Sequence, residues 1–224
     1  MKWVPRALLV LAAFAAAAQP VPPANLAATM QDISHALGVS CGYCHSAERG
    51  SGQPEPKKEI ARAMMAMTRD INARIEAAVG KTAAETARVD CVTCHRGVAV
   101  PRQLSDVLMQ TLREKGAAAA VAQYRDLYDR YSGRGAYDFG EDTLLGIAQT
   151  LANSRPDDAI ALLQLNLEFH PKSAQSYVVL AYAYTRKIDD ASAMAALEKA
   201  LTIEPDNGVA RGQLEQLKSY HRKR

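Results

Sequence analysis

The spacing of apolar residues predicts a short helix before the first pair of cysteines. Met30, Ile33 and Leu37 recur at i, i+3 and i+7, which places them on one helical face. Asn25 is a plausible N-cap for this helix and Gly38 a plausible stop. We therefore expect a helix from about residue 25 to residue 38 with one apolar face.

A second and longer helix is predicted to begin near Lys57, after two prolines, and to end at Gly80. Apolar residues recur along it at helical spacing, and two of them are methionines. A methionine stripe of this kind is more often part of a core than a set of metal ligands. The stripe consists of Ile60, Met64, Met67, Ile71 and Ile75, whereas Met65 is expected to point elsewhere.

After Pro101 the pattern becomes helical and repetitive, and it contains no cysteine. Two stretches, "DDAIALLQLNLEFHPKS" and "ASAMAALEKALTIEPDN", align at an offset of 34 residues. This offset is the tetratricopeptide period. It aligns Ala159 with Ala193, Leu163 with Leu197, Leu167 with Leu201 and Pro171 with Pro205.

From about Phe139 to Asn207 the chain resembles the tetratricopeptide repeat family, with Tyr177 and Tyr184 at its aromatic positions. Such helix pairs must stack to bury their apolar faces. Residues 104–131 would form a degenerate first pair, although the loop 132–140 is longer than the repeat normally allows, and residues 208–224 a capping helix. The resemblance implies a concave face that binds a protein or peptide; the alternative is that the repeats only cap and solubilise the preceding domain.

Composition and charge exclude some partners. The 224 residues are 48% hydrophobic and 23% charged, as in an ordinary folded protein, and the net charge is +3. This charge is too small to indicate nucleic acid or a membrane surface as a partner.

The first eighteen residues have the pattern of a signal peptide. Lys2 and Arg6 precede the apolar stretch 7–18, which ends in three alanines and is too short to span a bilayer comfortably. We expect cleavage before Gln19 and export to the periplasm, with an uncleaved signal anchor as the alternative.

The four cysteines form two CxxC pairs, and each pair is followed directly by a histidine. The motifs are Cys41-Gly42-Tyr43-Cys44-His45 and Cys91-Val92-Thr93-Cys94-His95. CxxCH is the signature of covalent c-type haem attachment, in which two thioethers fix the porphyrin and the adjacent histidine coordinates the iron. The sequence therefore predicts two covalently bound haem c groups. A four-cysteine zinc site and disulfides are the alternatives.

A methionine at the sixth position of each iron would complete its coordination. Met30 is the candidate for the first haem because its helical face leads to Cys41 and Cys44. Met64 or Met67 is the candidate for the second haem, whereas His35 lies off the face that carries Met30.

The segment from about Asn25 to Arg102 resembles the photosynthetic reaction-centre cytochrome c subunit family. The resemblance rests on "ATMQDISHALGVSCGYCH", "ARAMMAMTRDIN" and "DCVTCHRGVAVP". It implies Met30 as the distal ligand of the first haem and Met64 as that of the second, with Met67 as the fallback. Arg96, which follows the second motif, would neutralise a haem propionate or be an ordinary solvated arginine. The family's photosynthetic subunit carries four haems, and this chain has two motifs.

These patterns predict an all-α protein: a signal peptide at 1–18, a small two-haem cytochrome c domain at 19–102, and an α-solenoid of tetratricopeptide-type helix pairs at 103–224. We expect it to transfer electrons between redox partner proteins, to dock them through the repeats, to meet membranes only through partners, and not to be an enzyme. The alternatives are a haem enzyme of the two-haem peroxidase type with one open iron site, and a repeat scaffold whose haems are structural.

Overall fold

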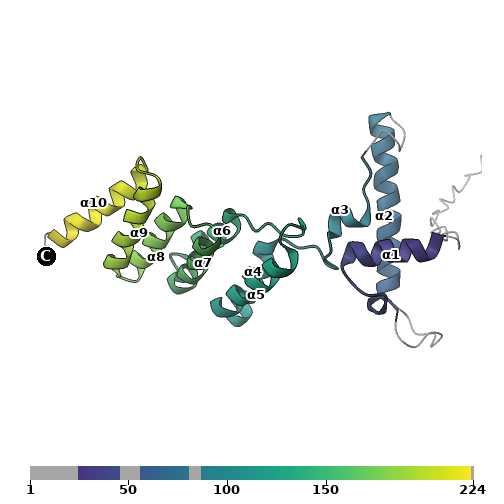
Figure 1. Ribbon diagram of the computed structural model, residues 1–224, viewed down its shortest axis with the longest axis horizontal. Coiled ribbons are helices and arrows are strands. Elements are labelled where there is room, and N and C mark those ends of the chain that lie inside the picture. The colour runs from purple at the N-terminus through teal and green to yellow at the C-terminus, as the bar shows by residue number, and fades with distance from the viewer. Residues whose placement is uncertain (1–24, 46–55, 81–86, 223–224) are drawn as a thin grey trace, which may run out of the picture. The chain divides into compact units, whose positions relative to one another are not determined.

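The computed structural model describes residues 25–45, 56–80 and 87–222, apart from the side chain of His221. These residues form helices and no β-strand, which confirms the predicted all-α fold class (Figure 1). The elements are α1 (Leu26–Leu37), the 3-10 turn η2 (Cys41–Tyr43), α2 (Pro56–Val79), α3 (Cys91–His95), α4 (Leu104–Lys115), α5 (Ala117–Tyr131), α6 (Glu141–Leu151), α7 (Pro156–Phe169), α8 (Ala174–Arg186), α9 (Asp190–Ile203) and α10 (Gly208–Arg222).

The chain divides into two compact units, residues 1–95 and 96–224. This division lies seven residues before the domain boundary that we predict at Arg102. The predicted signal peptide lies outside the described residues. None of the described helices combines the length and the apolar character that crossing a membrane requires.

In the first unit, the two helices predicted from periodicity are confirmed. α1 ends at Gly38, whose φ of 65° is the left-handed conformation that glycine adopts most easily. Asn25 occupies the N-cap position, but its side chain accepts no capping hydrogen bond. α2 begins at Pro56 and is followed by Gly80, as the sequence predicts.

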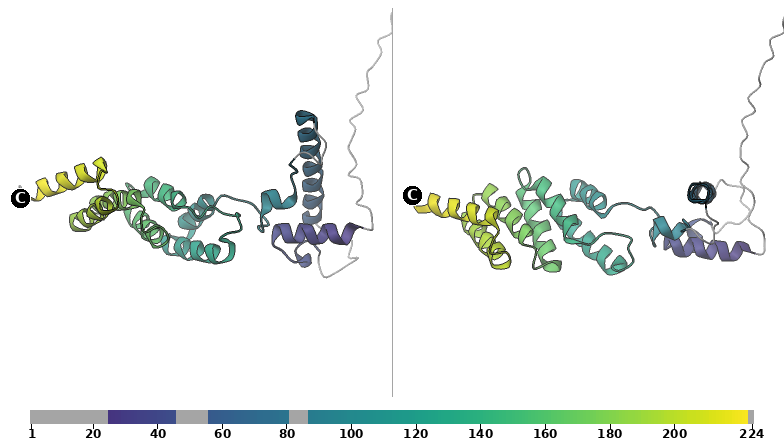
Figure 2. Two further views of the ribbon diagram at one scale, coloured as in Figure 1. Left: turned by 45° about the horizontal axis from the view of Figure 1, so that its top comes forward. Right: turned by 90° about the horizontal axis from the view of Figure 1, so that it is seen from above.

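The second unit is a stack of antiparallel helix pairs. α4 packs against α5, α6 against α7, and α8 against α9, and each pair also contacts the next (Figure 2). α10 packs on α9 and ends the stack. The first pair thus stacks like the others, despite the long loop that follows it.

The 34-residue offset of the sequence is reproduced in the helices themselves. α7 and α9 begin at Pro156 and Asp190, and α8 and α10 begin at Ala174 and Gly208, in both cases 34 residues apart. Aligned positions also have the same environment. The two alanines and the first pair of leucines are buried, and the second pair of leucines packs against the core; these residues are Ala159, Ala193, Leu163, Leu197, Leu167 and Leu201.

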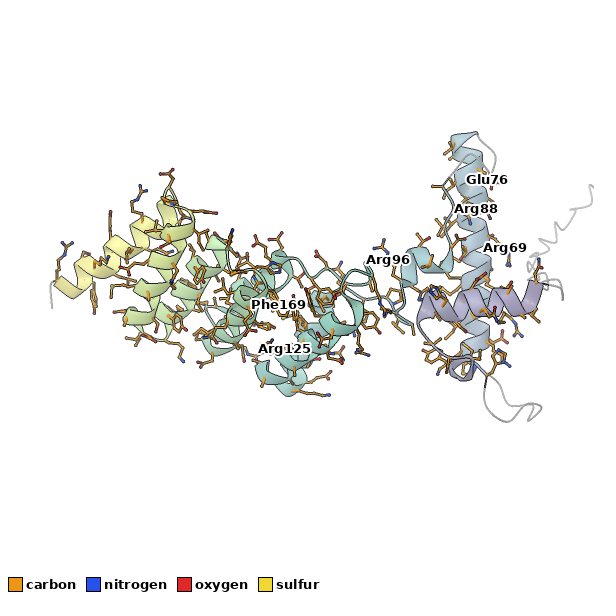
Figure 3. All side chains as sticks on the ribbon, viewed as in Figure 1. Arg69, Glu76, Arg88, Arg96, Arg125 and Phe169 are labelled. Carbon is orange, nitrogen blue, oxygen red and sulfur yellow. The ribbon has the colours of Figure 1, made fainter. Side chains whose placement is uncertain are left out.

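Aromatic contacts hold the long loop 132–140, and Phe139 makes most of them. The Phe139 ring lies 5.5 Å from the Tyr124 ring and 5.2 Å from the Tyr128 ring, measured between centroids. The Phe139 carbonyl lies 3.0 Å from His170 Nε2 and accepts a 3.5 Å hydrogen bond from the Tyr124 hydroxyl. Phe169 of α7 (labelled in Figure 3) completes this cluster, with its ring 4.6 Å from that of Tyr128.

A buried asparagine joins the second helix pair to the third. Asn166 of α7 donates to the Glu141 carbonyl at 3.1 Å and to the Ser176 hydroxyl at 2.9 Å. These hydrogen bonds tie α7 to the start of α6 and to α8. Because Asn166 and Ser176 are both fully buried, the repeat stack includes a polar contact as well as an apolar core.

We predict that the repeat unit loses stability at alkaline pH through Tyr124. Burial raises the pKa of this phenol from 10.0 to about 12. The folded state therefore holds the proton more tightly than the unfolded state, and this stabilisation is complete below about pH 10 and lost as the pH rises to about 12. In Tyr124→Phe, the alkaline loss of unfolding free energy should shrink by about 2 to 3 kcal/mol. The unfolding free energy is measured by urea titrations between about pH 9 and 12, with circular dichroism as the signal.

Tyr182→Phe is the matched control, because Tyr182 is 42% exposed and lies on another helix of the same unit. An unchanged alkaline loss in Tyr124→Phe, equal to that of the control, would contradict the assignment to Tyr124.

Candidate functional site

The first CxxCH motif follows α1 through a tight reversal of the chain. The backbone N–H of Gly38 donates to the His35 carbonyl at 3.1 Å, and that of Val39 donates to the Ser34 carbonyl at 3.0 Å. This pair of hydrogen bonds closes the helix and turns the chain back. The turn η2 then begins at Cys41, whose carbonyl accepts the N–H of His45 at 3.0 Å. The motif is therefore placed next to the helix that carries Met30.

A cavity of about 510 Å³ brings these residues together. Cys41, Cys44, His45 and Met30 all line it, as the sequence predicts for one haem site. A volume of this size lies in the usual range for sites of cofactors and small molecules. The other lining residues come from α1, the turn and α2: Leu26, Ile33, Ser34, Val39, Ser40, Lys58, Ala61, Arg62, Met65 and Arg69.

The donor set of this cavity suits a covalent haem. Two cysteine sulfurs can form thioethers, and an imidazole and a methionine thioether can coordinate one iron from two sides. The surrounding apolar side chains, such as Leu26 and Ile33, suit a porphyrin. The residues present therefore fit the group that the motif predicts.

Met65 points away from the stripe that contains Met64 and Met67, as predicted, but its face has a place in the site that the sequence analysis does not assign. Met65, which we expected to point away from the stripe, lines the cavity of the first motif. Met64 and Met67 are 41% and 46% exposed and do not belong to the residues that line this cavity. The helical period explains the difference, because residues 58, 62, 65 and 69 share one face of α2. Met64 and Met67 stay predictions as ligands of the second haem.

The second CxxCH motif forms the one-turn helix α3. The Asp90 N–H donates to the Thr93 hydroxyl at 2.9 Å, and the Thr93 N–H donates to the Asp90 carbonyl at 3.1 Å. α3 packs against α1. Cys91 and His95 are half-buried, and Cys94 is exposed.

Asn72 of α2 fixes the segment that leads into this motif. Its side chain donates to the Val89 carbonyl at 2.9 Å and accepts the Val89 N–H at 2.8 Å. Arg88, the residue before, lies 3.7 Å from Glu76 on the same helix as Asn72 (Figure 3). These contacts hold residues 88 and 89 on α2, two residues before Cys91. Asn72 has no place in the sequence analysis, since an isolated polar residue beside an apolar stripe gives no signal of its own.

α1 lies beside both motifs, since it lines the cavity of the first and packs against the helix that contains the second. Burial raises the pKa of the Cys91 thiol, a backbone hydrogen bond lowers it, and the charge of Asp90 raises it again. Asp32 of α1 is also near enough to raise this pKa. Met30 and Ile33 of the same helix line the first cavity, so α1 is in contact with both motifs.

Arg96 directly follows the second motif and has a backbone φ of 48°, in the left-handed region. Its guanidinium donates to the Gly135 carbonyl at 2.8 Å, in the loop before α6 (Figure 3). The interaction with a haem propionate that we proposed for Arg96 stays a prediction.

The described histidines outside the motifs have other environments. His35 is exposed, as its position off the helical face predicts, and His170 contacts the Phe139 carbonyl. The described cysteines form no disulfide. Within residues 25–45, 56–80 and 87–222, no group of three His, Cys, Asp or Glu side chains is placed to hold a metal ion, so the alternative four-cysteine zinc site is not assembled there.

Comparison with known proteins points to the same chemistry. A family model for the photosynthetic reaction centre cytochrome C subunit matches residues 41–132. Cytochrome c-554 of Chloroflexus aurantiacus is 40% identical over 65 residues, which are 29% of this chain and 15% of that protein. The N-terminal part of this chain is similar to the reaction-centre cytochromes. This similarity implies a covalently bound haem c.

The extent of the match differs from the resemblance found in the sequence. It begins at Cys41, so α1 with Met30 lies outside it, and it continues past Arg102 to residue 132. It therefore includes α4 and α5, which we predict as a degenerate first repeat. This chain matches only a small part of the length of its curated relative.

We predict that replacing Asn72 with alanine destabilises the segment that leads into the second CxxCH motif. Loss of its two hydrogen bonds leaves the backbone groups of Val89 without their partner, which costs about 1 to 3 kcal/mol. The segment before Cys91 should then detach from α2 at a lower temperature. Thermal melting of the full-length protein, followed by haem absorption and circular dichroism, measures this effect. Asp70→Ala is the matched control, because Asp70 is exposed on the same helix; an equal Tm in both variants would contradict the prediction.

Proposed function

We propose that this protein is an exported c-type cytochrome with two haems that transfers electrons between redox partner proteins. The observation that carries the proposal is the position of α1. One side of this helix lines the cavity of the first CxxCH motif, and the helix also packs against α3, which contains the second motif. The two motifs are thus neighbours within one small unit, which suits electron transfer between two attached groups.

The haems, when bound, supply the reversible Fe(III)/Fe(II) couple. The protein supplies thioether links from Cys41, Cys44, Cys91 and Cys94, and imidazole ligands from His45 and His95. Met30 is the proposed distal ligand at the first site. Met64 remains the proposed distal ligand at the second site, with Met67 as the fallback.

Two methionine side chains in the first cavity support electron transfer rather than chemistry at the iron. Met30 and Met65 approach the cavity from different helices. A thioether in the sixth position fills the iron's coordination and raises its reduction potential. A peroxidase-type enzyme would instead keep this position open. We therefore propose a carrier and not an enzyme.

The repeat unit is proposed to dock a protein or peptide. Two cavities, of about 390 and 840 Å³, lie between alternate helices of the stack. The first lies between α4 and α6 and is lined by Met109 and Ile147 among others. The second lies between α8 and α10 and includes Tyr182 and Tyr220. Aromatic and apolar side chains with polar neighbours are the usual composition of a recognition surface.

Export to the periplasm is part of the same proposal. It rests on the signal-peptide pattern at 1–18, which lies outside the described residues. Similarity to the reaction-centre cytochromes supports haem attachment in this proposal. We do not propose a photosynthetic reaction centre as the partner.

We predict two haem c groups per chain, measured as a pyridine haemochrome count on protein exported from a host that attaches haem c. The oxidised protein should show the weak charge-transfer band of a methionine–iron bond. Met30→Leu should remove the contribution of one haem to this band while nearly preserving side-chain volume. Met64→Leu should remove the contribution of the other haem to this band. The same measurement on Met65→Leu and Met67→Leu tests the other two methionines of α2.

Met109→Leu is the control, because Met109 lies in the repeat unit. A protein with two haems and a high-spin spectrum would favour the enzyme. A protein without haem would overturn the proposal and leave the repeats as the main function.

A further inference from the structure

Three cationic side chains of α2 line the cavity of the first CxxCH motif. They are Lys58, Arg62 and Arg69, and they share the cavity with Met65. The spacing of 4, 3 and 4 residues keeps all four side chains on one face of the helix. One face of α2 thus gives the cavity a methionine and three positive charges.

The cavity has no compensating carboxylate among its lining residues in the described part of the chain. Like charges on neighbouring turns of one helix face repel one another, and an anionic group in the cavity would be attracted to all three. The chemistry of this lining therefore indicates a ligand that carries negative charge as well as a large apolar surface. A haem, with its apolar ring and two propionates, has both properties.

The arginines differ in how far their charge is already balanced. Arg62 forms an ion pair with Glu59, one turn before it on α2. Arg69 (labelled in Figure 3) follows Arg62 by seven residues, about two turns of α2, and makes no hydrogen bond or ion pair with the described residues. Since Glu59 offsets much of the charge of Arg62, Arg69 brings the more effective positive charge.

We propose that Arg69, assisted by Arg62, binds a propionate of the haem attached at Cys41 and Cys44, and that its charge raises the reduction potential of that haem. This inference rests on the proposed haem attachment. Arginine suits the role because its planar guanidinium can donate two parallel hydrogen bonds to a carboxylate. The ferric state carries one more positive charge than the ferrous state, so a nearby cation disfavours the ferric state.

The test is a spectroelectrochemical titration of the full-length protein with both haems attached. In Arg69→Gln, one of the two one-electron steps should move to lower potential by about a tenfold change in its equilibrium constant, which is about 59 mV. The other step should stay where it is. Arg69→Lys should recover most of the shift, because it keeps the charge but loses the bidentate geometry.

Arg74→Gln is the matched control, because Arg74 is exposed on the same helix and does not line the cavity. A second variant leaves Arg69 intact. Glu59→Gln removes the partner of Arg62 and should move the same step in the opposite direction, to higher potential.

Equal shifts in Arg69→Gln and Arg74→Gln, or a Glu59→Gln titration identical to that of the unmodified protein, would overturn the assignment while the haem count still supports the proposed function. If Arg69→Gln fails to retain haem, the Glu59→Gln titration tests the proposal instead. A shift to higher potential supports it, and a shift to lower potential overturns it. A haem-free unmodified protein would overturn both the proposed function and this inference.

Discussion

The N-terminal unit has almost no apolar core of its own, because its described residues bury only Ala36 and Asn72. The repeat unit, by contrast, has a continuous apolar core that runs from α4 to α10. Burial of apolar surface is the main favourable contribution to folding. A small unit that buries so little apolar surface usually needs a further source of stability, such as a bound group. The exposed apolar residues of α2, such as Ile60 at 56%, are consistent with a fold whose interior includes the haem.

This constraint explains the polar contacts of the unit. Asn72 is the one buried polar residue described there, and both of its hydrogen bonds go to the backbone of Val89. The Gly38 turn has a similar role at the first motif, since it fixes where Cys41 follows α1. In both places a local hydrogen-bond pattern positions a CxxCH motif. Backbone hydrogen bonds thereby fix where the cysteines of each motif lie. At the first motif, side chains of α1 and α2 form the apolar and charged lining of the cavity.

Much of this arrangement could be predicted from the sequence, because it is periodic or carries a motif. The bounds of α1 and α2 follow from glycine, proline and apolar spacing, and the repeat stack follows from the 34-residue offset. The position of Met65 in the first cavity could not be predicted, because several methionines of α2 fit the helical period. Asn72 and Arg69 were missed for a related reason. Asn72 acts through hydrogen bonds to Val89, and the proposed role of Arg69 follows from its place in a cavity shared with α1 and η2. A one-dimensional pattern contains neither arrangement.

The two units therefore differ in how much apolar surface their own side chains bury, and this difference bears on the proposed function. In the repeat unit, α7 and α8 are joined by a fully buried Asn166–Ser176 contact and surrounded by leucines, so its shape is determined by its own residues. A surface of determined shape can present its grooves to a partner with little loss of conformational entropy on binding. In the first unit, Arg69 and Met65 lie on one face of α2 and line the cavity of the first motif, where we propose that they act on the bound haem. The proposed redox function thus belongs to a unit with little apolar core of its own, whereas the proposed docking function belongs to the unit with the continuous core.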